Sequence, residues 1–595
     1  MLDERRQFRV LFRVFLSRAV ELDLLSPGGN VENLAIQFVA LLLAFNFVVA
    51  YVMTPRYFTS PLPSAILRVN AWSDEEFLVS TTISVVGMFL ILAWDNLLPD
   101  IRDALVLTVL PVRARTIAFS KITAIACAVG IVVVCVNFFT SFCYAGIVGG
   151  DAGTFGVVRA FVSYWMTMAF AAVFMVAVLV GVPGVTAQFL SYRSFLRVSG
   201  VLELMAFFAI LGVYFLKPQL ATVAALHAPQ NASWLNLLPS YWFLGLFERL
   251  NGSGDPVLVR LGSRAIEAMI CALLAGGTVL ALVYLRTVKK IIEAPDISRA
   301  AHLPLGSRIL IALATRIFRR PIDRAILLFI SRTLARSHRH RLLLAIYGGI
   351  GLAVALAYAE SLVRGEWEQK WYQPNALLLV ASFVILFFVV PGMRIVFTFP
   401  HALRSNWIFR VTAVQHPSRY FFAVRKALYC LAVFPILAIS GMLLFALWPT
   451  RPVLLHMGVF LLVAILAAEK LLHGFRKIPF TCSYLPGKAN LNFKLGAYAA
   501  VILFAAHWGG FLEFWAIEKP SRYVALVAIL LTLAVWARFR FHEFATAPQT
   551  PIQFEERPPA DVYALDLRLD GELLGGDLYV EPKSRGGLRW GTPGR

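Results

Sequence analysis

The feature that most constrains this chain is a series of long apolar runs. A helix needs about 20 apolar residues to cross a bilayer, and a spanning segment must satisfy every backbone polar group internally. By this criterion, six predicted spans lie near residues 33–53, 77–94, 122–147, 157–182, 199–216 and 265–285. Six more lie near residues 342–358, 376–396, 427–448, 453–469, 496–516 and 522–538. We therefore predict an all-α integral membrane protein with about twelve transmembrane helices.

The composition agrees with this fold class and argues against several others. The chain is 59% hydrophobic and 15% charged, which no water-soluble globular protein of 595 residues would sustain. A formal net charge of +21 could indicate nucleic acid, but basic residues beside spans are expected at the anionic cytoplasmic face. We therefore expect no nucleic-acid partner. Nearly all six cysteines lie in apolar runs, so neither a disulfide framework nor a metal cluster is indicated.

The distribution of Lys and Arg predicts the orientation. Residues 286–341 carry thirteen basic and three acidic side chains, and the loop between the eighth and ninth spans carries five basic and no acidic ones. The alternate loops are mixed or acidic, as in "AWSDEEF" at 71–77 and "RGEWEQK" at 364–370. Because cytoplasmic loops are enriched in Lys and Arg, we predict that both termini are cytoplasmic.

A short phrase occurs twice, once before the first span of each half. "FLSRAV" stands at 15–20 and "FISRTL" at 329–334, and a shift of about 305 residues lays spans one to three on spans seven to nine. The same shift places "LPVRARTIAFSK" at 110–121 beside "VQHPSRYFFAVRK" at 414–426. We interpret this as a six-span unit that occurs twice, a common arrangement in transporters. The alternative is that residues 15–18 merely cap an amphipathic interface helix.

These observations divide the chain into five predicted parts. They are an amphipathic cytoplasmic interface helix at 1–32, a first six-span half at 33–290, a basic linker with a second interface helix at 291–341, a second six-span half at 342–538, and a cytoplasmic tail at 539–595.

Three stretches of the first half resemble the type-two exporter permeases of ABC transporters. "RRQFRVLFRVFLSRAVEL" precedes the first span as the family's interface helix does. "WDNLLPDIRDALVLTVLPVRARTIAFSKI", between spans two and three, is similar to the family's coupling segment. "WLNLLPSYWFLGLFERLNG", between spans five and six, is similar to its short outer helices. The second half departs from the pattern, because only a short turn around "EKPS" joins its last two spans.

The resemblance implies a subunit that moves a drug, a lipid-like molecule or a polysaccharide with a separate cytoplasmic ATPase. It also implies residues that couple the chain to that ATPase, and the expected set is Asp100, Arg102, Asp103, Leu105, Val109, Leu110, Arg113, Arg115, Lys121, Arg404, Arg410, Arg419 and Lys426. ATP and magnesium would act through the partner. The expected location is the bacterial plasma (inner) membrane.

No motif in the chain predicts catalysis. No stretch matches the Walker A pattern, and "LPGKAN" at 485–490 lacks both the leading glycine and the hydroxyl residue after its lysine. "HEFAT" at 542–546 lacks the second histidine of a zinc-binding helix. We therefore predict that the chain is not an enzyme and holds no metal. Asp74, Glu75 and Glu76 could belong to a membrane glycosyltransferase, but we interpret them as a solvated outer cluster.

The main alternative function is a secondary transporter of the major-facilitator kind, which also has twelve spans and a basic central loop. Ionisable groups inside spans are costly and are functional candidates by default. Three are found within or at the ends of predicted spans, namely Glu203, Glu469 and His507. The simpler interpretation is that these side chains lie near helix ends and reach water.

Overall fold

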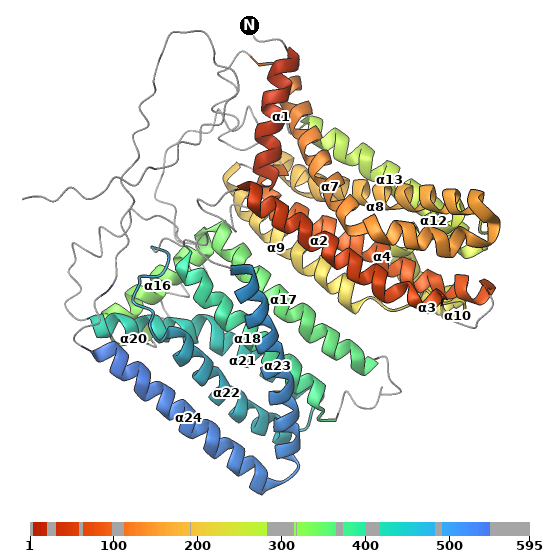
Figure 1. Ribbon diagram of the computed structural model, residues 1–595. Helices are drawn as coiled ribbons and strands as arrows, with labels where there is room; N and C mark the ends of the chain where they lie inside the picture. The colour runs from red at the N-terminus through yellow and green to blue at the C-terminus, as the bar shows by residue number, and fades with distance from the viewer. Residues whose placement is uncertain are drawn as a thin grey trace, which may run out of the picture. The chain divides into compact units, whose positions relative to one another are not determined.

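The computed structural model describes most of the chain. The described residues are 4–20, 31–58, 64–97, 112–190, 192–282, 315–316, 318–363, 373–399, 417–481, 491–547 and 552. Their regular structure is helical throughout (Figure 1). Ten of these helical segments are long and apolar enough to cross a membrane. By the length and composition of its helices, the chain is therefore an all-α integral membrane protein.

The first half consists of seven long helices and several short ones. The long helices are α1 (Glu4–Val20), α2 (Val31–Met53), α4 (Ser64–Leu92), α7 (Ala114–Gly149), α8 (Gly153–Phe189), α9 (Tyr192–Leu216) and α13 (Pro256–Leu282). The short ones include α3 (Pro55–Phe58), α5 (Trp94–Leu97), α10 (Val223–His227), α11 (Ala232–Leu237) and α12 (Pro239–Leu250). Helices α10 to α12 occupy the stretch in which the resemblance implied short outer helices.

The second half consists of long helices with no short helices between its last two long ones among the described residues. Its helices are α16 (Pro321–Arg336), α17 (His338–Val363), α18 (Ala376–Thr398), α20 (Pro417–Leu428), the π-helix η6 (Tyr429–Val433), α21 (Phe434–Leu447), α22 (Thr450–Leu472), α23 (Leu491–Ile517) and α24 (Pro520–Thr546). Helices α20, η6 and α21 together form one candidate span, Pro417–Leu447.

The described residues of the twelve predicted spans fall almost entirely on helices, but two of these helices, α13 and α23, are not among the ten candidates. Helix α13 carries Arg260, Arg264 and Glu267 and is not among the ten candidates. The described apolar part of α23 is the shorter segment Val501–Ile517. The ten candidates correspond to α2, α4, α7, α8, α9, α17, α18, α20–α21, α22 and α24.

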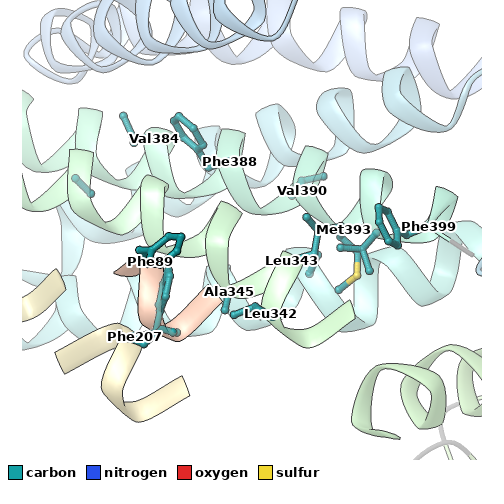
Figure 2. Packing of buried hydrophobic residues seen from close by; sticks show 14 of the residues in the cluster. Phe89, Phe207, Leu342, Leu343, Ala345, Val384, Phe388, Val390, Met393 and Phe399 are labelled. Carbon is teal, nitrogen blue, oxygen red and sulfur yellow. The ribbon is translucent and has the colours of Figure 1, made fainter. Parts of the chain in front are cut away.

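Buried apolar side chains form one large cluster to which both halves contribute. Figure 2 shows Phe89 of α4 and Phe207 of α9 beside Leu342 and Ala345 of α17, and all four belong to this cluster. Helices α9 and α17 pack closely at Gly349 of α17. A Cβ atom added to this glycine would lie only 2.3 Å from Cε1 of Phe207 in α9. Glycine is therefore required for the aromatic ring to approach the α17 backbone.

Candidate functional site

Two of the three acidic residues of the first-half cluster, Glu75 and Glu76, are buried, which contradicts the prediction of a solvated outer cluster for them. Helix α4 begins at Ser64, well before the predicted span start at residue 77, and contains Asp74, Glu75 and Glu76. Glu75 is 0% exposed and Glu76 is 1% exposed. Hydropathy alone starts the predicted span after these charged residues. The helical backbone instead continues through them, and neighbouring helices cover the two glutamates. Glu75 and Glu76 are therefore not the solvated acids that the glycosyltransferase alternative assumed, whereas Asp74 is only half-buried.

Glu76 forms a buried ion pair with a lysine at the end of α9. The Nζ atom of Lys217 lies 2.5 Å and 2.6 Å from the two carboxylate oxygens of Glu76. Lys217 is 8% exposed, and its ammonium group also lies 5.9 Å from the ring centroid of Tyr214. Two charges removed from water in this way are stable only as a pair, because each alone would carry an uncompensated desolvation penalty.

A pocket of about 530 Å³ lies over this ion pair, between α2, α4 and α9. Its charged lining consists of Asp74, Glu76 and Lys217, and its apolar lining includes Val48 and Phe77. The volume is within the range typical of small-molecule sites. An apolar wall next to charges of both signs suits an amphiphilic ligand with a polar head group.

Glu75 does not share in the Glu76 ion pair. Neither of its carboxylate oxygens has a partner with good hydrogen-bond geometry among the described residues, although the Tyr144 hydroxyl is close enough to interact with the carboxyl group. Its titratable neighbours include Tyr144 and Glu248, and the hydroxyl of Tyr144 donates to the carbonyl oxygen of Ala71. Buried polar groups are normally satisfied, so a carboxyl group in this position is a strong functional candidate.

A hydrogen-bonded network joins α2, α4, α7 and α8 in the interior of the first half. Asn46 Nδ2 donates to Thr140 Oγ1 at 3.0 Å, and Thr140 Oγ1 lies 3.0 Å from the Tyr164 hydroxyl. The Tyr164 hydroxyl donates to Asn137 Oδ1 at 2.7 Å, and Asn137 Nδ2 donates to Thr82 Oγ1 at 3.0 Å. All five side chains are buried. Such a network fixes the relative register of four helices where no water can substitute for a lost bond.

Of the three predicted intramembrane candidates, two glutamates are buried and the histidine is half-buried. Glu203 lies inside α9 and is buried, so the interpretation as a helix-end group that reaches water is wrong for it. Glu469, near the end of α22, is also buried, and its Oε1 atom lies 3.2 Å from both Arg425 Nη1 and the Tyr429 hydroxyl. His507 Nδ1 lies 3.3 Å from the Tyr358 hydroxyl. The structure does not bring these three side chains into one site.

The predicted coupling residues are only partly described. Asp100, Arg102, Asp103, Leu105, Val109, Leu110, Arg404 and Arg410 lie outside the described residues. Arg113, Arg115 and Arg419 are exposed, Lys426 is half-buried, and Lys121 is buried. Two of the predicted coupling residues contact the amphipathic helices α1 and α16. Lys121 Nζ lies 5.5 Å from the ring centroid of Phe15 in α1, and Lys426 forms an ion pair with Asp323 in α16.

Sequence reasoning missed one further buried pair, His456 of α22 with Glu513 of α23. Both residues lie inside predicted spans, at 453–469 and 496–516, and an ionisable residue inside a span was the available signal. Among the described residues, no group of three or more His, Cys, Asp or Glu side chains is placed to hold a metal ion.

No protein-family model, curated protein or solved structure matches this chain.

Proposed function

We propose that this chain is the membrane permease subunit of an ATP-binding-cassette exporter with two fused six-span halves. It would move a hydrophobic, lipid-like, drug or polysaccharide substrate with energy from a separate cytoplasmic ATPase. Both termini would be cytoplasmic, and the expected location is a bacterial plasma membrane. ATP and magnesium would bind to the partner subunit.

The observation that carries the proposal is the recurrent packing of an amphipathic helix against the third span of each half. Helix α1 packs against α7, and helix α16 packs against α20 (Figure 1). In the first half, Phe15 is buried under Lys121, and Glu4 forms an ion pair with Arg113. This arrangement gives a rigid connection between an interface helix and a spanning helix, which can transmit a rigid-body displacement.

The second half forms the same connection with different side chains. Asp323 of α16 forms an ion pair with Lys426 of α20, and Ile326 and Ile330 of α16 are buried. The two lysines, at positions 121 and 426, are separated by the shift of about 305 residues that relates the halves. Some pairs of long helices that pack together also correspond, such as α4 with α8 and α18 with α22, whereas the packing of α17 on α18 has no equally extensive counterpart between α2 and α4. These correspondences support a duplicated unit.

Purification of the tagged chain from its native membrane tests the proposal. We expect an ATPase in stoichiometric amount by mass spectrometry, and ATP hydrolysis that requires both proteins. A matched preparation of Asp323→Asn should show a reduced amount of the ATPase, because it weakens the α16–α20 connection without changing the spans. A pure chain without an ATPase that still transports a dye along a proton gradient would refute the proposal.

A secondary transporter remains the second candidate because ionisable side chains are buried within the helices of both halves. Glu76 is paired with Lys217 and His456 with Glu513. Intramembrane pairs of this kind mark ion pathways in many transporters. Uptake into liposomes that depends on a proton gradient and not on ATP would favour this candidate.

A further inference from the structure

His456 and Glu513 form an isolated ionisable pair in the second half. The Nδ1 atom of His456 lies 3.0 Å and 3.1 Å from the two carboxylate oxygens of Glu513. Both residues are 0% exposed. The imidazole stacks on Phe460 with ring centroids 5.2 Å apart, and Phe383 of α18 meets it edge-on at 5.8 Å. The Nε2 atom of His456 is buried without a hydrogen-bond partner among the described residues.

Several ionisable side chains near the junction of α23 and α24 have partners other than Glu513. On α24, the Tyr523 hydroxyl donates to the carbonyl oxygen of Leu455 at 2.9 Å, and Arg522 lies over the ring of Trp515 with its guanidinium 4.1 Å from the centroid. In the turn after α23, Glu518 lies 3.7 Å from Arg522. The described residues of α21 include no ionisable side chain.

The remaining neighbours also do not supply a counter-charge. On α18, Arg394 Nε donates to the carbonyl oxygen of Leu471 at 3.1 Å. On α20, Arg425 is paired with Glu469 of α22. His507 of α23 bonds to Tyr358 of α17. Arg451 in the first turn of α22 is exposed. Among the described residues, His456 is the only basic group whose charge acts on Glu513.

The number of protons on the pair sets its net charge, and the cost of a buried charge decides which form is stable. A neutral imidazole that donates Nδ1–H to a carboxylate leaves the pair with one net negative charge and with a bare Nε2. One added proton makes the pair neutral, either as imidazolium with carboxylate or as imidazole with carboxylic acid. An uncompensated charge in an apolar interior costs several kcal/mol, roughly, after relaxation. The neutral, singly protonated pair is therefore the stable form in this environment.

We propose that His456 and Glu513 form a binding site for one proton inside the second half, and that this site is occupied in the described conformation. Proton uptake takes the pair from one net negative charge to neutrality, with Nε2 or the Nδ1–carboxylate hydrogen bond as the place of the added proton. Release requires water or a cation to reach the pair, so it requires this part of the bundle to open. The proposal does not depend on the choice between an ATPase and an ion gradient as energy source.

The pH dependence of unfolding tests this site. Above pH about 6.5 an unfolded histidine is neutral and an unfolded glutamate is ionised, so the unfolded pair holds no proton. The folded pair holds one, so its contribution is full below that pH and is lost as the pH rises. We expect this pair to raise the unfolding equilibrium constant about tenfold per pH unit above pH about 6.5. SDS-induced unfolding in mixed micelles, followed by tryptophan fluorescence between pH 6 and 9, measures it.

Three variants separate this site from all other titrating groups. Glu513→Gln should lose the tenfold-per-unit component, because a neutral histidine beside an amide holds no extra proton. His456→Gln should keep the component and extend it to lower pH, because a lone buried carboxyl group stays protonated in the folded state. His507→Gln, a matched change on the same helix, should behave as the wild type.

A direct proton count covers the case in which a variant folds poorly. Wild-type protein unfolded by SDS at pH 8 in weak buffer with a pH-sensitive dye should release about one proton more per chain than Glu513→Gln, in line with the linkage relation. Equal release, or a wild-type pH slope identical to that of Glu513→Gln, would overturn the proposal and leave a purely structural pair.

Discussion

Replacement of Lys217 by methionine should destabilise the first half strongly. Methionine matches the four-atom stem of lysine without its ammonium group, so it leaves the Glu76 carboxylate buried with no cation at 2.5 Å. Breaking a buried pair by removing one partner costs about 3–5 kcal/mol, because the remaining charge loses its compensation. Since the side chains of Lys217 and Glu76 are 4% and 1% exposed, solvent screening reduces this value little. We therefore expect the free energy of unfolding to fall by about 3 kcal/mol or more.

The assay is SDS-induced unfolding in mixed micelles, followed by tryptophan fluorescence. Lys470→Met is the matched control, because Lys470 is an exposed lysine near the end of α22 and should change stability by less than about 0.5 kcal/mol. The double variant Lys217→Met with Glu76→Gln should recover much of the loss, since both charges are then absent. A Lys217→Met variant as stable as the control, or additive effects in the double variant, would refute the burial argument.

Three further predictions follow from the fold. Tyr164→Phe should cost about 1–3 kcal/mol of unfolding free energy in the same assay, because it removes the two buried hydrogen bonds of the Tyr164 hydroxyl, to Thr140 and Asn137; an unchanged midpoint would contradict the network. Gly349→Ala should cost about 1–3 kcal/mol by overpacking against the phenylalanine ring of α9. Its neighbour Gly348→Ala is the control, since that Cβ atom would meet only Val389 at an ordinary 3.8 Å. A cysteine at Asn231 should react with an impermeant maleimide from outside intact cells and one at Arg419 should not; the reverse labelling would refute the predicted orientation.

The sequence predicts the helices well because apolar length is a local property. Each predicted span lies on a helix, and the amphipathic segment before the first span is α1. The scan fails where charge interrupts a helix. It placed the start of the second span after Glu76, although the backbone hydrogen bonds of α4 continue back to Ser64. A lysine that is distant in sequence, Lys217, compensates the acid, and no local pattern contains that information.

The sequence predicts the candidate site less well because burial depends on tertiary neighbours. The sequence marks Glu203 and Glu469 as ionisable residues in apolar segments. It does not predict that they are buried, because burial depends on side chains of other helices. His456 and Glu513 are 57 positions apart in the sequence and meet only because α22 packs against α23. A single histidine or glutamate inside a span is therefore a sound starting point, whereas its partner must come from the structure.

The π-helix η6 has a consequence for the proposed ancestry of the two halves. Helix α7 is continuous over 36 residues, whereas its counterpart in the second half is interrupted by Tyr429–Val433. A π-turn accommodates one residue more than the α-turn that it replaces, and one residue rotates an α-helix by about 100°. In an uninterrupted α-helix, an inserted residue would move every later residue onto a neighbouring face, whereas the π-turn absorbs it. An insertion of one codon would therefore leave Lys426 aligned with Lys121 and every later residue on its original face, but displaced by one position in the sequence. A comparison of the halves without gaps would lose its register here, and the correct alignment should contain a single-residue gap within Tyr429–Val433.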